Sequence, residues 1–248
     1  MFWIRNKKVY GVIKVILKSF LVILALIVIK IIITAYPNMF FWHSITYKNF
    51  SVHSTQVIDN RIYKILDKAT SNLTTFKIND TNAVYRVYLC QSSSFYHTLI
   101  FPYVAKSIAF NFPHTNMIFI KNADVLKDIA NIEDMDDTRK LSKVITHEIT
   151  HTFEEKVFQN AKIPFSNVET WKTEGYCDLV GYNDTLDITN AKEFIKGHKN
   201  TIMTFKDIRR EYYFAVSYLV YFEKMSFEDI LKSNLTLTEV LDKIENIR

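Results

Sequence analysis

The chain has 248 residues with only 4 glycines, which lie too far apart to form the glycine-rich loop of a P-loop or dinucleotide-binding enzyme, so we expect no nucleotide cofactor. Its net charge of +5 comes from residues 1–36, which hold six of the 31 basic residues and no acid; the other residues carry 25 basic against 26 acidic side chains, so we expect no nucleic-acid partner. Hydrophobic residues at 48% and charged residues at 23% exclude disorder as the main state.

The N-terminal region contains one long apolar stretch. Between Ser19 and Trp42 the only charged residue is Lys30, and as a helix this stretch would reach about 36 Å, enough to cross a hydrocarbon core of about 30 Å. Aromatic residues flank it on both sides, as they do at membrane interfaces. Basic residues before it favour a cytoplasmic N-terminus. We therefore predict a transmembrane signal-anchor within residues 1–36 that places residues 37–248 outside the cytoplasm.

Two alternatives stay open for this apolar stretch. A cleaved signal peptide would leave a secreted protein, although the stretch is longer than the usual apolar region of about 7–15 residues and no small-x-small cleavage site follows it. A buried or interfacial helix would accommodate Lys14, Lys18 and Lys30, because a lysine at the centre of a membrane costs about 2–3 kcal/mol.

Residues 37–248 contain no linker, repeat or low-complexity tract, so we expect them to form one domain with a sizeable core. Apolar residues at helical spacing predict a helix over about residues 54–70. The segments Val84–Cys90 and Met117–Ile120 are typical of strands. From Asp137 onward the pattern is helical almost to the end. Because strands come first and helices follow, we predict an α+β domain.

Only two cysteines occur, Cys90 and Cys177. In an oxidising compartment they could pair, but two thiols do not make a disulfide scaffold. The alternative for Cys177 is the role of a small buried residue.

The stretch His147-Glu148-Ile149-Thr150-His151 carries the most specific chemical signal in the chain. Its apolar neighbours predict a helix, with Asp136 or Asp137 as N-cap. His147 and His151 are one turn apart, so both imidazoles face the same side of that helix and can bind one Zn²⁺. Glu148 would lie beside the metal, where it can take a proton from the attacking water and pass it to the leaving amine.

A second motif supplies the third ligand that a hydrolytic zinc site needs. Glu174 follows His151 by 23 residues, in the segment Trp171-Lys172-Thr173-Glu174-Gly175-Tyr176-Cys177-Asp178. Asp178 is one helical turn beyond Glu174, so it can hold the free ring N–H of a ligating histidine, His147 in the first place. Two histidines and a glutamate can coincide on a solvated helix face, but the second motif favours the metal site. Because Gly175 has no Cβ, we also expect it to let the zinc helix approach closely.

The pattern H-E-x-x-H followed after some twenty residues by W-x-x-E-G-x-x-D resembles that of the gluzincin metallopeptidases. The resemblance implies that Glu174 binds zinc and that Asp178 supports a ligand. The segment Tyr212–Phe222 is similar to the next helix of small bacterial peptidase-MA-like domains. It implies a tyrosine that faces the zinc and stabilises the oxyanion, Tyr212 or, as the alternative, Tyr213, although both are also spaced for packing in a core.

The resemblance also implies a zincin-like domain, with a small mixed sheet followed by a mainly helical part. Met117, Ile118, Phe119 and Ile120 resemble the edge strand along which gluzincins bind an extended substrate; the alternative is an ordinary core strand. No segment resembles the G-A-M-E-N motif that binds a free N-terminal amine in related aminopeptidases, so we expect endopeptidase activity.

Together these features predict a membrane-anchored zinc peptidase with one Zn²⁺ per chain on His147, His151 and Glu174. Glu148 would be the general base, and the substrate a peptide or protein outside the cytoplasm. One alternative is a domain that keeps zinc but serves as a non-catalytic binding or structural module of the envelope. Another is an anchored helical partner protein without a metal.

Overall fold

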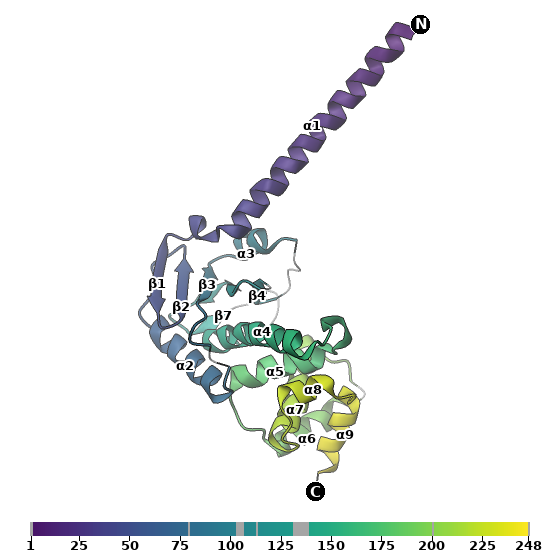
Figure 1. Ribbon diagram of the computed structural model, residues 1–248. Coiled ribbons are helices and arrows are strands. Elements are labelled where there is room, and N and C mark those ends of the chain that lie inside the picture. Colours follow the sequence, from purple (N-terminus) through teal and green to yellow (C-terminus); the bar gives the residue numbers. More distant parts are fainter. Residues whose placement is uncertain are drawn as a thin grey trace.

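Figure 1 shows the chain as a computed structural model in which one long N-terminal helix leads into a sheet, and a group of helices follows. The structure describes residues 2–78, 80–102, 107–112, 114–130, 139–199 and 201–247, with residues 2–12 described by their backbone alone. The prediction of an α+β arrangement, with strands before helices, is confirmed.

Helix α1 (Phe2–Ala35) extends away from the rest of the chain (Figure 1). Its segment Ile13–Ala35 is long and apolar enough to cross a membrane, and none of that segment is buried against the protein. The helix ends well before Trp42, the predicted end of the apolar stretch. Pro37 accounts for this end, because a proline disfavours helical backbone in the residue before it.

The main sheet has five strands in the order β1-β2-β3-β5-β4, of which β2, β3 and β5 are parallel to one another while β1 and β4 run antiparallel at the two sides. Its strands are β1 (His43–Tyr47), β2 (Phe50–Ser54), β3 (Tyr85–Cys90), β4 (Ala109–Phe112) and β5 (Met117–Lys121). A small antiparallel sheet follows, made of β6 (Ala123–Asp124), β7 (Ile129–Ala130) and β8 (Arg139–Lys140). Both predicted strands are therefore present, as β3 and β5, to within a residue.

The prediction that Met117, Ile118, Phe119 and Ile120 form an edge strand is wrong. They lie in β5, which pairs with β3 on one side and β4 on the other, and all are buried. A continuous apolar run is typical of a strand that is covered on both faces. Among the strands that the structure describes, β4 is the edge strand on this side of the sheet.

The helices after the first strands are α2 (Ile62–Thr75), α3 (Ser93–Ile100), α4 (Leu141–Ala161), α5 (Thr170–Tyr182), α6 (Ile188–His198), α7 (Phe205–Tyr221), α8 (Phe227–Lys232) and α9 (Leu237–Asn246). Two short 3₁₀ turns are η1 (Pro37–Phe40), which comes before β1, and η2 (Phe165–Asn167), which follows α4. Helix α2 starts later than the predicted residue 54, which is the end of β2. The Asp59 side chain accepts a hydrogen bond from the Arg61 backbone N–H, in a turn that delays the helix.

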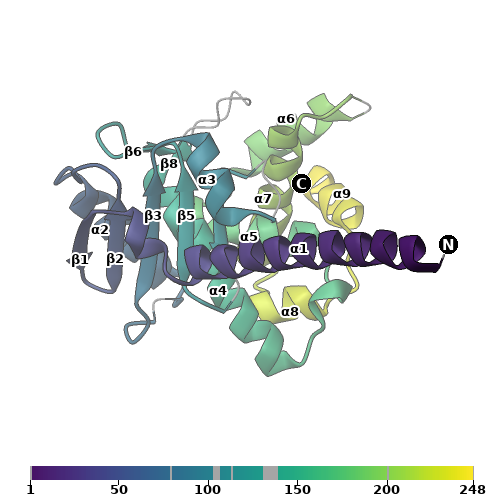
Figure 2. The same cartoon turned by 90° about the horizontal axis from the view of Figure 1, so that it is seen from above.

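The two faces of the main sheet are covered differently. Helices α2 and α4 cover one face, where alternate strand residues such as Val87 and Ile118 join the larger core. Helix α3 covers the other face, over β3 and β5 (Figure 2). There the other strand residues pack with residues of α3 and with Phe41 to form a second core. We call this core the aromatic cluster: Phe41, Tyr88, Cys90, Tyr96, Leu99, Ile100, Phe112, Met117 and Phe119. The period of two along each strand produces this division.

Candidate metal centre

Three helices that pack against one another carry the candidate site. Helix α4 contributes His147 and His151, α5 contributes Glu174 and Asp178, and α7 contributes Arg209. Helix α5 lies between the other two and packs against both. The arrangement therefore brings together residues from two sequence motifs and from a third helix that neither motif includes.

Helix α4 begins at Leu141, and its first turn is capped by a residue from a preceding loop. The Asp128 carboxylate accepts a hydrogen bond from the Ser142 N–H, and the Asp128 carbonyl accepts one from the Leu141 N–H. A negative charge at this end is favourable because of the helix dipole. The predicted caps, Asp136 and Asp137, lie outside the described residues.

Each histidine has a carboxylate against its Nδ1 atom. His147 Nδ1 lies 2.9 Å from Asp178 Oδ1, and His151 Nδ1 lies 2.8 Å from Glu154 Oε2. A carboxylate at this position favours the tautomer with a proton on Nδ1, which leaves the lone pair of Nε2 for a metal. Asp178 thus lies where the sequence predicts it, whereas Glu154 was not foreseen as a partner.

The Glu174 carboxylate faces both Nε2 atoms. Its Oε2 lies 3.5 Å from His147 Nε2, and its Oε1 lies 3.8 Å from His151 Nε2. Two ligand atoms at about 2 Å from the same tetrahedral ion are about 3.3 Å apart, so these separations leave room for one ion between the three side chains. The three side chains therefore offer two nitrogen donors and one oxygen donor to a metal ion.

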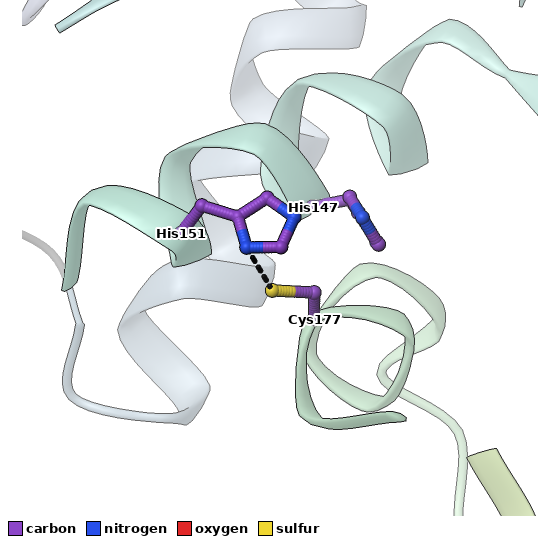
Figure 3. Close-up of side chains that lie close together, drawn as sticks. All are labelled: His147, His151 and Cys177. Atoms are coloured by element: carbon purple, nitrogen blue, oxygen red, sulfur yellow. Dashed lines mark hydrogen bonds between the residues drawn. The ribbon is translucent and has the colours of Figure 1, made fainter. Parts of the chain in front are cut away.

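Cys177 is a further candidate ligand. Donor atoms of His147, His151 and Cys177 all lie within 4.8 Å of one another, a group that could hold a metal ion (Figure 3). The Sγ atom, however, lies 3.3 Å from His151 Nδ1, the nitrogen that also faces Glu154. Burial, reinforced by the Glu154 charge, raises the pKa of the Cys177 thiol well above its usual value, which favours the protonated form.

The two cysteines do not pair. Both thiols are free and buried, with Cys90 in the aromatic cluster and Cys177 beside His151 on the helical side. The interpretation of Cys177 as a small buried residue is correct for its burial but missed its contact with the histidine.

Arg209 on α7 links the acidic residues of α5. Its Nε donates a hydrogen bond of 2.9 Å to Asp178 Oδ2, and the guanidinium also forms an ion pair with Glu174. Arg139 Nη1 lies 3.7 Å from Asp178 Oδ1 on the other side. Since a buried carboxylate costs several kcal/mol when it is unpaired, these cations stabilise the acidic cluster. Sequence reasoning missed Arg209, because no spacing rule connects it with either motif.

The two histidines differ in their electrostatic surroundings. Burial lowers the pKa of His147, and the Asp178 carboxylate offsets this effect only in part. Burial also acts to lower the pKa of His151, but the charge and hydrogen bond of Glu154 outweigh it and raise the pKa. Compared with an exposed histidine, the surroundings therefore disfavour the charged form of His147 and favour the charged form of His151.

Beside these residues lies a cavity of about 890 Å³. The edge strand β4 lines it with Phe110 and Asn111, and α4 lines it with both histidines and with Glu148, whose side chain is largely buried. The Asn111 side-chain amide donates hydrogen bonds to the Glu148 carbonyl at 3.0 Å and to Thr152 Oγ1 at 2.9 Å. Strand β4 is thus attached to the helix that carries the histidines.

The predicted oxyanion residues are not brought to this cavity. Tyr212 and the alternative Tyr213 are half-buried against the larger core, and neither is among the described residues that line the cavity. The Tyr213 ring instead packs on Tyr182, with ring centroids 5.1 Å apart. The residues of α7 that line the cavity are Phe205, Lys206 and Arg209, all in the first part of the helix.

The expectation that Gly175 lets the zinc helix approach is wrong, because this residue faces α7. A Cβ built at Gly175 would lie 2.4 Å from the Tyr212 carbonyl oxygen. Gly181, one turn beyond Asp178 on the same helix, is the glycine that faces α4: its Cβ would lie 3.1 Å from the Lys143 carbonyl oxygen and 3.8 Å from the His147 Cβ. Two small residues on α5 thus allow both neighbouring helices to pack closely.

Comparisons of this sequence with protein-family models and with curated proteins gave no match, so the function has to be inferred from the geometry of the site.

Proposed function

We propose that the protein is a membrane-anchored zinc peptidase whose metal is held by His147 Nε2, His151 Nε2 and Glu174. The observation that carries this proposal is the position of the Glu174 carboxylate opposite both Nε2 atoms, at 3.5 and 3.8 Å. Zinc in such a site polarises a carbonyl group and lowers the pKa of water. We infer a zincin-like fold from the same arrangement, in which a helix with both histidines packs against a helix with the third ligand.

Glu148 is the proposed general base. It follows His147 directly and lines the cavity, so its carboxylate can take a proton from the attacking water and deliver it to the leaving amine. Asn111 supports this role, because its hydrogen bond to the Glu148 carbonyl fixes the backbone at that point. Asp178 and Glu154 would orient the two ligating imidazoles, and Arg209 would position Glu174 and Asp178. Tyr212 is left out of this mechanism, since it does not line the cavity.

The substrate that suits this site is an extended peptide. Strand β4 is the edge strand next to the cavity, in place of the predicted β5, and an edge strand offers backbone donors and acceptors to an added strand. Such pairing recognises a polypeptide backbone whatever its side chains. We infer endopeptidase-like activity on peptides or proteins on the side of the membrane opposite the basic N-terminus.

A zinc-binding module without catalysis is the second candidate function, and Cys177 is the observation that favours it. If the thiol joined His147, His151 and Glu174, four protein ligands would close the site, as in structural zinc centres, and leave no position for water. The contact of Sγ with Nδ1 instead of Nε2 favours the open site.

The proposal is tested with the full-length chain in detergent. We expect the wild type to bind one zinc ion, measured by elemental analysis, and to cleave members of a mixed peptide library, detected by mass spectrometry. Glu148→Gln should keep the zinc and lose hydrolysis by at least two orders of magnitude, because general acid–base catalysis contributes about 10²–10⁴-fold. The exposed Glu193→Gln on α6 is the matched control.

Three outcomes would contradict the proposal in different ways. Zinc without cleavage in the wild type would favour the binding module, absence of zinc would favour a metal-free partner protein, and full activity of Glu148→Gln would overturn the mechanism. Replacement of single ligands distinguishes the open site, without Cys177, from the closed site, with Cys177. Glu174→Gln should lower zinc affinity strongly, whereas Cys177→Ala should leave it unchanged.

A further inference from the structure

Lys30, the charged residue within the apolar end of α1, has partners in the folded domain. Its Nζ donates hydrogen bonds to the carbonyl oxygens of Thr98, at 2.9 Å, and Leu99, at 2.6 Å. Both carbonyls belong to the last turn of α3, where backbone acceptors lack intrahelical partners and the helix dipole favours a cation. Lys30 thus joins the apolar helix to the carboxyl end of α3.

This contact places α3 beside α1 and not beyond its end. Lys30 comes five residues before Ala35, the last residue of α1, which corresponds to about 7.5 Å along the helix axis. Ile33, between them, packs against the aromatic cluster. Phe101 follows α3 directly, two residues after Leu99, whose carbonyl oxygen accepts the Lys30 hydrogen bond, and its apolar side chain is 67% exposed.

The segment that leaves α1 adds further apolar side chains at the same place. Tyr36 and Met39 are each 65% exposed, and Trp42 is 78% exposed. Figure 1 shows that this segment and α3 both lie where α1 enters the domain. We call Tyr36, Met39, Trp42 and Phe101 the collar.

We propose that the collar inserts into the interface of the membrane that α1 crosses, and that Lys30 holds α3 at that depth. The collar lies next to Ile13–Ala35, the apolar segment of α1, in which no residue is buried although Lys30 and Ile33 contact the domain. Two of its four residues, Tyr36 and Trp42, are of the aromatic types that are enriched at the level of lipid headgroups. Hydrogen bonds from Lys30 are strong in such a low-dielectric layer. The domain is then held against the membrane in one orientation instead of swinging on a tether.

This inference rests on α1 spanning the membrane, but not on peptidase activity, and the two are tested separately. The full-length chain is reconstituted in phosphatidylcholine vesicles and extracted with alkaline carbonate. Release of the wild type into the supernatant would overturn the anchor and the collar together, whereas retention in the pellet establishes the anchor and leaves the collar to the next measurement.

Because Cys90 and Cys177 are buried, one introduced cysteine can be labelled selectively with an environment-sensitive fluorophore. We expect the label at Phe101→Cys to be quenched several-fold more by headgroup-level nitroxide lipids than the label at Ile202→Cys, which is fully exposed in the loop after α6. Equal quenching at the two sites would overturn the collar.

The role of Lys30 has its own variant. Lys30→Met keeps an unbranched side chain and adds no polar group to the membrane, so insertion should persist. The label at residue 101 should then lose at least half of its lipid quenching, since α3 is no longer held. Unchanged quenching in Lys30→Met would overturn the positioning role of this lysine.

Discussion

The two faces of the main sheet are covered by different kinds of buried side chains. On the side of α2 and α4, ionisable side chains of opposite charge are buried together, among them Glu154, Asp178 and Arg209. On the face of α3, stability comes from ring packing, with Tyr88 stacked between Phe119 at 4.6 Å and His53 at 4.9 Å. Burying charge costs free energy unless every group is paired, whereas rings gain by burial alone. We call the face that α2 and α4 cover the chemical face and the face that α3 covers the packing face.

Removal of the carboxylate that joins the helices of the chemical face should have the largest effect on stability. Asp178→Ala takes away the acceptor of Arg209 Nε and the partner of His147, and loss of one member of a buried ion pair costs about 3–5 kcal/mol. Urea unfolding of the zinc-free protein in detergent measures this loss. The exposed Asp242→Ala is the control, and an equally small change in both variants would contradict a paired network.

A methyl group between α5 and α7 should have the next largest effect. Gly175→Ala places a Cβ 2.4 Å from the Tyr212 carbonyl oxygen, so α7 has to shift, and overpacking of this kind costs about 1–3 kcal/mol. Because α7 carries Arg209, zinc affinity should fall as well. Gly197→Ala is the matched control: its Cβ meets nothing within 4 Å, and it should stabilise α6 by about 0.5–1 kcal/mol.

A conservative change on the packing face should have a smaller effect and leave the chemistry intact. Phe119→Leu loses the stacking with Tyr88 and the edge contact with Phe112 at 5.3 Å, which together contribute about 1 kcal/mol. Zinc affinity, measured by competition with a chelator, should stay at the wild-type value. A change in affinity would show that the two faces are coupled through β5.

The smallest effect concerns pH. His147, with a lowered folded pKa, contributes stability that is present above pH 6.5 and is lost as the pH falls; His151, with a raised pKa, contributes stability that is present below pH 6.5 and is lost as the pH rises. The two contributions oppose each other in the metal-free protein. His53, whose pKa is also lowered by burial, contributes a pH dependence of the opposite sign in every variant. With chelator present, the urea midpoint from pH 6 to pH 8 should therefore change in the destabilising direction in His147→Gln relative to the double variant His147→Gln/His151→Gln, and an equal change in the two would contradict the assigned partners.

Local patterns predicted the chemical face better than the rest of the chain. The spacing of His147 and His151 fixes a common helix face, and the one-turn spacing of Glu174 and Asp178 fixes theirs, so the four residues meet once α4 and α5 pack.

Features that depend on long-range contacts could not be predicted in this way. The run Met117–Ile120 shows a buried strand but does not reveal which strands flank it, so its edge position was wrong. Arg209 reaches the site through the packing of α7 on α5, and the partner of Gly175 depends on the same contact. From the sequence alone, Lys30 is an unfavourable charge in an apolar helix. Its acceptors on α3 lie 68 and 69 residues away in sequence, so local patterns could not reveal this contact.

The two hydrogen bonds of Asn111 join β4 to α4, the two elements that line the cavity with Asn111 and with Glu148. Because one amide holds both the Glu148 carbonyl and Thr152 Oγ1, strand β4 cannot slide along α4 without breaking both bonds. Any loop that pushes on β4 therefore also moves the backbone of Glu148. If the protein binds the extended peptide that we propose, β4 and the backbone of Glu148 would therefore already be fixed relative to each other before the peptide binds.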